Sequence, residues 1–376
     1  MPLAFAYLLS ALCGSMTAVA ISVHFAESGH GAFIITGTLL AGACAHIFLT
    51  PLPAPLFDRH SAKRLGISAA LIDVTMLVIL IVWPHPWVLI LGTFISSATA
   101  GIIMPALFTL AEHHETTNPA AAFFRLDTAR LIGSFTGPML GGLLVQVASL
   151  RSAFATEILA SLIMLLVLSR STAPPPAPTT AAPGFIARII QAPKLLFQNR
   201  QTRTALQGMW GAIIFTSIYN IALVFYAVDV LHIGGLGYAI LTQAFIVGRI
   251  VGAKLAARCT TDRAYRTVII GGAIMGAAIA LAGFVPNVVV AVASFTVAGI
   301  CNAAQVAALR LLIVFAVPEA VRPKALSTMG TVNTSAMLVG YLLGAPVVNL
   351  LGPAMALIIA GVGTLTVTML PTVGRR

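Results

Sequence analysis

Long apolar runs, separated by short polar segments, make up most of this chain. Each run has about 18 to 25 residues, the length that an α-helix needs to cross roughly 30 Å of hydrocarbon. Strands of a membrane barrel would be shorter and would alternate between apolar and polar residues. The pattern therefore predicts an all-α integral membrane protein.

Twelve spans can be delimited, six on each side of a proline-rich stretch near the middle of the chain. The first six are expected at residues 3–25, 31–56, 65–83, 87–111, 122–148 and 152–169. The other six are expected at residues 205–229, 235–257, 267–285, 287–316, 326–349 and 351–371. The shortest breaks are WPHPW at 83–87 and NLLGP at 349–353, where proline and glycine interrupt the helical pattern.

The central stretch divides the chain into two halves. Residues 171–184, STAPPPAPTTAAPG, cannot continue a helix and have little apolar surface to bury. The next segment, FIARIIQAPKLLFQNRQTR, mixes apolar and basic residues, as an amphipathic segment on an anionic membrane or a simple surface loop would. We expect an N-terminal six-helix bundle at 1–170, a cytoplasmic linker at 171–204 and a C-terminal six-helix bundle at 205–376.

Composition and charge support this organisation and orient it. Charged residues make up only 8% of the chain, against about 25% in a soluble domain. With loops assigned alternately to two sides, Arg151 falls on one side and Arg249 and Arg310 fall within spans, whereas all other Lys and Arg residues fall on the opposite side. Basic loops stay cytoplasmic, so both termini are expected there, in a bacterial inner membrane. Nucleic-acid binding is excluded, because the basic residues are scattered over short loops without aromatic neighbours.

Two pairs of similar segments indicate that the halves are repeats. ARLIGSFTGP from Ala129 and AMLVGYLLGAP from Ala336 share the pattern A-x-L-[IV]-G-x-x-x-G. DRHSAKR from Asp58 is echoed by DRAYR from Asp262. Parallel six-helix repeats are typical of transporters whose substrate site lies between the halves, near the bilayer midplane.

Three segments resemble motifs of the major facilitator superfamily. Its signature G-x-L-x-D-R-x-G-R-[RK] is matched by Leu56, Asp58, Arg59 and Lys63, with Ala54 and Ser61 in place of the glycines and Ala62 in place of the first trailing arginine. RLIGSFTGPMLGGLLV, ending at Val145, resembles the G-P-x-L-G-G-x-L run of drug exporters and enterobactin-type siderophore exporters. PEAVRPKALS, from Pro318, resembles P-[DE]-x-x-R-G-[RK]-x-x-[ST] of the same branch, with Pro323 in place of its glycine.

The resemblance implies two six-helix bundles that rock about a central site in a secondary active transporter. Proton-coupled export of a drug-like or siderophore-like molecule is the expected function, and import of a siderophore or organic anion on the same fold is the alternative. In this family the loop aspartate pairs with basic residues and a helix terminus of the opposite half, which biases the conformational equilibrium. The gate residues here would be Asp58, Arg59, Lys63, Arg125 and Arg130. The other reading of Asp58 is a solvated loop with one stray acid.

Ionisable residues inside the predicted spans are functional candidates, because each costs at least about 2.5 to 3.5 kcal/mol in the membrane. The resemblance places Arg249 and Arg310 on cavity-lining spans, where they would bind an anionic group of the substrate. Asp73 and Glu157 lie on the peripheral third and sixth spans and are candidates for proton coupling, although Glu157 could instead pair with Arg151 at the interface. His46, near the middle of the second span, is a third candidate because of its ordinary pKa of about 6.5; a packed, neutral histidine is the alternative.

Polar uncharged residues of the cavity spans are concentrated in the second half, which suggests that this half grips the substrate. They are Tyr219, Asn220, Gln243, Asn302, Gln305 and Asn333. Helix packing is the alternative role for each of them. For Gly133, Gly137, Gly141 and Gly142, close helix packing is the expected role, with a bend at Pro138.

The sequence does not contain the residue patterns that other classes of function require. The His and acidic residues are too dispersed for a membrane-embedded enzyme. The nucleotide loop G-x-x-x-x-G-K-[ST] does not occur, so ATP is not expected to be the energy source. The four cysteines, Cys13, Cys44, Cys259 and Cys301, have no metal-like spacing. We expect a monomer without cofactor or metal, whose partners are a small-molecule substrate, protons and the lipid bilayer.

Overall fold

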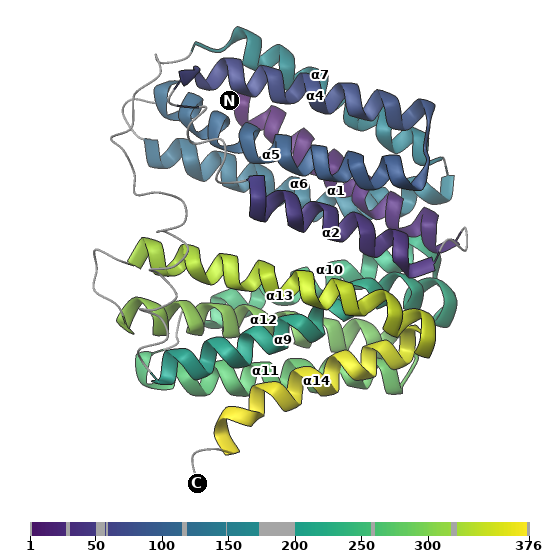
Figure 1. The fold of residues 1–376 in the computed structure, drawn as a ribbon, viewed down its shortest axis with the longest axis vertical. Coiled ribbons are helices and arrows are strands. Elements are labelled where there is room, and N and C mark those ends of the chain that lie inside the picture. The colour runs from purple at the N-terminus through teal and green to yellow at the C-terminus, as the bar shows by residue number, and fades with distance from the viewer. Residues whose placement is uncertain are drawn as a thin grey trace. The chain divides into compact units, whose positions relative to one another are not determined.

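The computed structural model describes residues 2–27, 31–49, 57, 59–114, 119–147, 149–172, 200–256, 260–316 and 322–373. Within these ranges the chain is helical and has no strand (Figure 1). The first half contains α1 (Pro2–Glu27), α2 (Gly31–Leu49), α4 (Ala62–Val82), α5 (Pro86–His114), α6 (Pro119–Val147) and α7 (Leu150–Arg170). The second half contains α9 (Arg200–Phe225) with its π-helical extension η1 (Tyr226–Val230), α10 (Gly234–Ala256), α11 (Thr261–Phe284), α12 (Val288–Ala316), α13 (Arg322–Leu351) and α14 (Pro353–Val373).

Each of the twelve predicted spans coincides with one of these helices, which confirms the predicted all-α membrane fold. Ten of the helices contain a segment that is long and apolar enough to cross a membrane, so the chain is a multi-pass membrane protein. Residues 50–56, the last part of the second predicted span, lie outside the described residues. The proline-rich stretch and the basic segment after it fall largely within 173–199, which is outside them as well.

The two shortest breaks are where the sequence predicts them. After α4, the amide of Trp83 still donates to Ile79 O at 2.8 Å, and α5 then begins at Pro86, where a missing amide proton costs nothing. Between α13 and α14, Gly352 has a φ of 82°, in the left-handed region that favours glycine. The backbone can therefore reverse direction there within a single residue.

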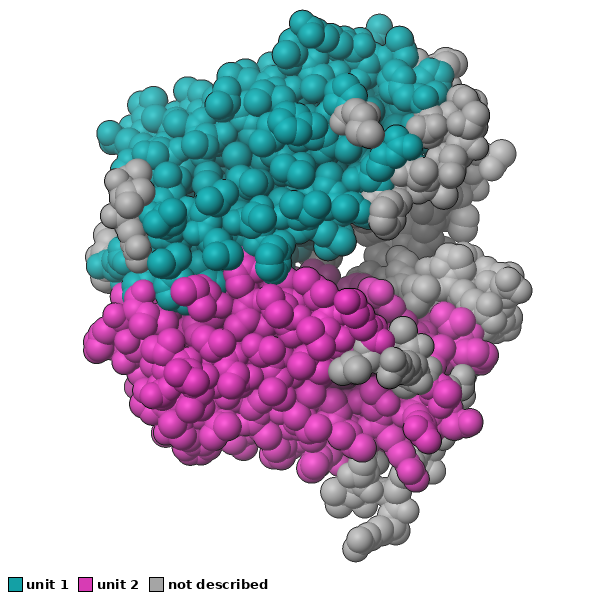
Figure 2. Space-filling model, turned by 180° about the vertical axis from the view of Figure 1, so that it is seen from behind, with its two compact units in different colours: residues 1–30, 37–182, 234–239 teal, residues 31–36, 183–233, 240–376 magenta. Residues whose placement is uncertain are grey.

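The helices form two compact units (Figure 2). Unit 1 comprises residues 1–30, 37–182 and 234–239, and unit 2 comprises residues 31–36, 183–233 and 240–376. Each unit has its own apolar core. In unit 1 a cluster of α1, α4, α5, α6 and α7 includes the buried Leu107 and Leu126. In unit 2 a corresponding cluster of α9, α11, α12 and α13 includes the buried Leu309 and Ile313.

In unit 1, glycines hold α6 directly on the backbone of α1. A Cβ atom at Gly133 would lie 2.5 Å from Leu8 O, and one at Gly137 would meet Leu12 O. One turn further along, Gly141 faces the carbonyl oxygen of Met16 in the same way. Because no side chain fits between the two backbones, the predicted packing role of these glycines is confirmed.

The repeated glycine pattern makes the equivalent contact in unit 2. Gly340 of α13 faces the Ile214 carbonyl of α9, and Gly344 faces the side chain of Ile221 one turn later. The fifth helix of each unit thus packs on the first helix through the same two positions of the A-x-L-[IV]-G-x-x-x-G repeat. The repeat seen in the sequence is therefore a repeat of helix contacts.

Candidate functional site

A carboxyl group of α4 lies among hydroxyl groups of two neighbouring helices in unit 1. The hydroxyl of Ser96, on α5, donates to Asp73 Oδ1 at 2.7 Å, and that of Ser161, on α7, donates to Asp73 Oδ2 at 3.1 Å. Ser161 is 7% exposed, and Thr99, whose hydroxyl bonds the Ser96 carbonyl at 2.9 Å, is 4% exposed. Both oxygens of Asp73 are therefore held in the helix contact rather than in bulk water.

A second carboxyl group, that of Glu157, lies on the same face of α7, one turn before Ser161. It faces α1: a Cβ atom at Gly14 would be 3.5 Å from Glu157 Oε1, and Thr17 is a hydrogen-bonding neighbour. The carboxyl groups of Glu157 and Asp73 are also close enough to interact electrostatically. Two candidates that the sequence treats separately therefore form one site between α1, α4, α5 and α7.

The surroundings of this pair determine what it can do. In the part of the chain that the structure describes, neither carboxyl group forms an ion pair with a cation, and Glu157 makes none with Arg151. Two ionised carboxylates within electrostatic range of each other repel, and hydroxyl donors compensate less charge than a cation would. A proton on either carboxyl group removes part of that cost. The site is thus suited to taking up and releasing a proton.

His46 lies on α2, within the second predicted span. The described part of that span ends at Leu49, and residues 50–56 lie outside it. The side chain of His46 is exposed. Within the described residues, no hydrogen bond or ion pair joins it to the carboxyl pair, and its role in proton coupling stays a prediction.

The predicted gate residues are placed only in part, because Asp58 lies outside the described residues. Arg59 and Arg125 are exposed. Lys63 donates through Nζ to Ser169 O at 2.6 Å, and so links the start of α4 to the end of α7. Arg130 pairs with Asp127 one turn away, with 3.7 Å between Arg130 Nε and Asp127 Oδ1, and both side chains are well exposed. Such a surface pair contributes little to stability.

Ser61, which replaces a glycine of the family signature, has a local structural role. It is the N-cap of α4, with an extended backbone (φ −64°, ψ 145°), and its hydroxyl accepts a hydrogen bond from the Arg64 amide at 3.4 Å. The helix therefore begins at Ala62, after the aspartate and arginine of the motif. In unit 2 the equivalent Asp262 and Arg263 lie inside the first turn of α11.

The two intramembrane arginines of unit 2 have exposed side chains. Arg249 is on α10, which packs closely on α12: a Cβ atom at Gly299 would be 3.0 Å from the Arg249 amide nitrogen. Arg310 is on α12, next to the buried Leu309 and one turn from the buried Ile313. Helix packing thus fixes the backbone of each arginine and leaves its side chain accessible.

The polar uncharged candidates divide into accessible and packed residues. Asn220 is exposed and Asn333 is half-buried. Tyr219 is 4% exposed, with its ring centroid 5.2 Å from that of Phe295, and Gln243 is 6% exposed. The first two are thus open to a ligand as they stand, whereas the other two belong to the interior of unit 2.

Asn302 and Gln305 both face α11. The Asn302 amide contacts Met275 Sδ at 3.8 Å, and Gln305 Nε2 donates to Val268 O at 3.1 Å. Gln305 is also only 1% exposed. These contacts favour the packing role that the sequence leaves open for the two residues.

The hydroxyl groups around the carboxyl pair are functional candidates that sequence reasoning missed. Ser96, Ser161 and Thr17 are ordinary residues for a membrane helix, where hydroxyls usually bond their own backbone. The spacing of Glu157 and Ser161, four residues apart, was an available signal, because such residues share a helix face. Nothing in the sequence shows that this face meets Asp73.

The chain matches the family model described as Major Facilitator Superfamily over residues 3–261. It is 30% identical over 111 residues to the multidrug resistance protein MdtG of Salmonella arizonae, a segment that covers 29% of this chain and 28% of that relative. MdtG of Salmonella newport gives the same values. The match thus spans less than a third of the length of these relatives.

Solved structures of transporters share the fold at low sequence identity. A mutant of the nucleoside transporter NupG has a TM-score of 0.80 and 14% identity, covering 100% of this chain and 99% of that chain. A POT family transporter in complex with a thioalcohol-conjugated peptide has a TM-score of 0.72 and 14% identity, covering 99% and 95%. The human organic anion transporter MFSD10 has a TM-score of 0.62 and 14% identity, covering 98% of each chain.

Proposed function

The chain belongs to the major facilitator superfamily, and on that premise we propose that it exports a small drug-like or siderophore-like compound in exchange for protons. Membership makes it a transport protein rather than an enzyme. Two units with equivalent helix contacts are what alternating access requires, because each can move as a rigid body. The local similarity to a multidrug resistance protein supports export.

The observation that carries the proton-coupled part is the carboxyl pair of Asp73 and Glu157. Asp73 accepts hydrogen bonds from Ser96 and Ser161, and Glu157 lies one turn from Ser161. A carboxyl group in a membrane helix is costly and indicates a function unless a cation neutralises it. A proton that binds the pair from one side and leaves to the other would couple the pH gradient to the movement of unit 1.

For the substrate we propose contacts from unit 2. Arg249 and Arg310 are exposed cations within spans, and Asn220 and Asn333 are accessible amides. A guanidinium group binds carboxylate or phosphate through two parallel hydrogen bonds, so the proposed substrate carries an anionic group. Asp58 with Arg59, Lys63, Arg125 and Arg130 remains the proposed gate at the face where we place both termini.

Transport by purified protein in liposomes tests the proposal. With an imposed pH gradient, a panel of siderophores, organic anions and cationic drugs should include a compound that accumulates against its own gradient. Arg249→Gln and Arg310→Gln should each reduce the flux of an anionic substrate at least tenfold, which corresponds to about 1.4 kcal/mol. Arg170→Gln, at the exposed end of α7, removes the same charge and should retain normal flux.

The direction of transport separates export from the alternative, import of a siderophore or an organic anion. Accumulation in inside-out vesicles with an acidic interior indicates export in exchange for protons. Accumulation in right-side-out vesicles with an acidic exterior indicates import. If the pH gradient drives no compound of the panel in either direction, proton coupling is wrong, while the family assignment still holds.

A further inference from the structure

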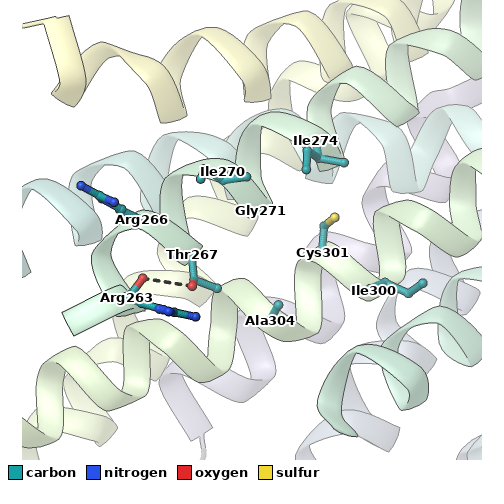
Figure 3. A pocket seen from close by; sticks show the side chains of 9 residues that line it. All are labelled: Arg263, Arg266, Thr267, Ile270, Gly271, Ile274, Ile300, Cys301 and Ala304. Carbon is teal, nitrogen blue, oxygen red and sulfur yellow. Dashed lines mark hydrogen bonds between the residues drawn. The ribbon is translucent and has the colours of Figure 1, made fainter. Parts of the chain in front are cut away.

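A groove runs between α11 and α12 of unit 2, and none of the proposed substrate or proton-coupling residues lines it. Its volume is about 500 Å³. Figure 3 shows Arg263 and Arg266 at one end of it and the apolar side chains of Ile270, Ile274 and Ile300 further along. The groove is therefore cationic at one end and apolar over the rest of its length.

The α11 wall of the groove is one continuous helix face. Arg266, Ile270 and Ile274 are four residues apart, so their side chains follow one another along the helix. Ile270 is 55% exposed and Ile274 is 45% exposed, which means that the groove is open to the surroundings of unit 2. An exposed isoleucine face within a span is suited to contact with acyl chains.

The α12 wall is made of smaller residues, and this is what hollows the groove. Cys301 and Ala304 line it, opposite Gly271 of α11. A Cβ atom at Gly271 would lie 3.3 Å from Cys301 O, so the two helices are in close contact at the floor. The floor of the groove is thus set by the helix contact.

The charge at the cationic end lacks a partner within the described parts of the chain. Arg263 and Arg266 are both exposed, and neither forms an ion pair there. The exposed Asp262 is adjacent to them in the first turn of α11. The positive end of the helix dipole adds to the two guanidinium charges, so an anion is favoured at this end of the groove.

We propose that the groove binds an anionic phospholipid, with its phosphate between Arg263 and Arg266 and one acyl chain along the isoleucines. The distance from Arg263 to Ile274 is eleven residues, or about 16 Å of helix, close to half of the roughly 30 Å hydrocarbon thickness. Basic pockets between membrane helices bind such head groups. Bound lipid would bridge α11 and α12. The inference depends on membrane embedding, but not on the proposed substrate or coupling.

Lipid binding measured by native mass spectrometry of the detergent-solubilised protein tests the proposal. Wild type should retain phosphatidylglycerol in preference to phosphatidylcholine. Arg263→Gln with Arg266→Gln should weaken phosphatidylglycerol binding about tenfold. The matched control, Arg170→Gln with Arg203→Gln, removes two exposed charges outside the groove and should stay within about twofold of wild type.

A second variant tests the apolar part without changing charge. Ala304→Phe fills the groove and should weaken phosphatidylglycerol binding, and size-exclusion chromatography shows whether the variant folds. Binding should also slow the alkylation of Cys301 in wild type, measured on the peptide that contains it. Equal retention of the two lipids, equal losses in the control pair, or the same protection by inorganic phosphate alone would each overturn the proposal.

Discussion

The third and sixth helices of each unit pack against each other, but in two different ways. In unit 2 these helices are α11 and α14, and a Cβ atom at Gly276 would lie 2.5 Å from the Gly361 carbonyl oxygen. In unit 1 they are α4 and α7, and the Ser161 hydroxyl donates to Asp73 Oδ2 at 3.1 Å, with Glu157 one turn away. The first contact includes glycine backbones, and the second includes a carboxyl group and a hydroxyl.

The difference between the two contacts indicates whether the acids of unit 1 serve packing or function. Unit 2 shows that glycines packed against apolar neighbours can join these two helices without an acid. The acids of unit 1 are therefore not needed for the contact, and buried charged groups are usually neutral or unfavourable for stability compared with apolar residues. This is why we assign the pair to proton coupling, and why its substitution should affect transport more than folding.

The largest expected effect on folding comes from breaking the glycine contact. Gly361→Leu would force a side chain into a position where its Cβ already lies 2.7 Å from Ala280 Cα. We expect a loss of at least about 2 to 3 kcal/mol of stability, since two backbones must separate. Membrane yield and the thermal unfolding midpoint measure it. Gly101→Leu, at a glycine of α5 with nothing within 4 Å, should retain both; equal losses in the two variants would refute the assignment.

The next effect is a loss of pH-driven transport when both carboxyl groups are removed. Asp73→Asn with Glu157→Gln preserves the shape of both side chains and removes both groups that could carry a proton. We expect uphill flux driven by a pH gradient to fall by about 100-fold, because proton transfer is lost. Exchange of substrate without a gradient should persist, because substrate contacts are proposed in unit 2. Flux assays on the same proteoliposome preparation measure both quantities.

Two comparisons make the acid experiment specific. Glu112→Gln removes an exposed acid near the end of α5 and should not change either flux. Asp73→Leu with Glu157→Leu should give a protein at least as stable as wild type that lacks pH-driven flux. If the leucine variant unfolds, the acids are structural; if it still accumulates substrate, they do not carry the proton.

A smaller effect is expected from the hydroxyl that joins the two carboxyl-bearing helices. Ser161→Ala removes one donor to Asp73 and should cost about 1 to 3 kcal/mol, the penalty for a buried acceptor that loses its partner. Coupled flux should fall less than in the acid variants, because Ser96 still donates to Asp73. Ser68→Ala is the control, since the Ser68 hydroxyl only bonds Leu65 O in its own helix, at 3.0 Å. If Ser68→Ala loses as much stability as Ser161→Ala, the hydrogen bond from Ser161 to Asp73 has no special role.

Much of the fold could be predicted from the sequence, because membrane helices satisfy their backbone hydrogen bonds locally. Apolar runs therefore give the spans, and Gly352 and the prolines give the breaks. The repeat at Ala129 and Ala336 indicated two similar halves, and the glycines at 133, 137, 141 and 142 predicted close helix packing in the first of them. These signals are contained within short segments of the chain.

The site could be predicted only in part, because it depends on which helix faces meet. The cost of an acid in a membrane singled out Asp73 and Glu157 one by one. Their proximity is set by the packing of α4 and α7, and no residue of either helix encodes it alone. Gln305 shows the opposite case: the sequence makes an amide in a span a substrate candidate, whereas its hydrogen bond to Val268 O favours a packing role.

The smallest expected effect concerns the start of α4, where the units differ again. Ser61 caps this helix, whereas the equivalent position of unit 2, Tyr265, is buried within α11. Ser61→Ala should cost about 1 kcal/mol through loss of the cap, while Ser61→Gly should cost only a few tenths. Thermal unfolding of the two variants under identical conditions gives the difference. If alanine and glycine are equivalent, the hydroxyl does not hold the start of α4 at Ala62.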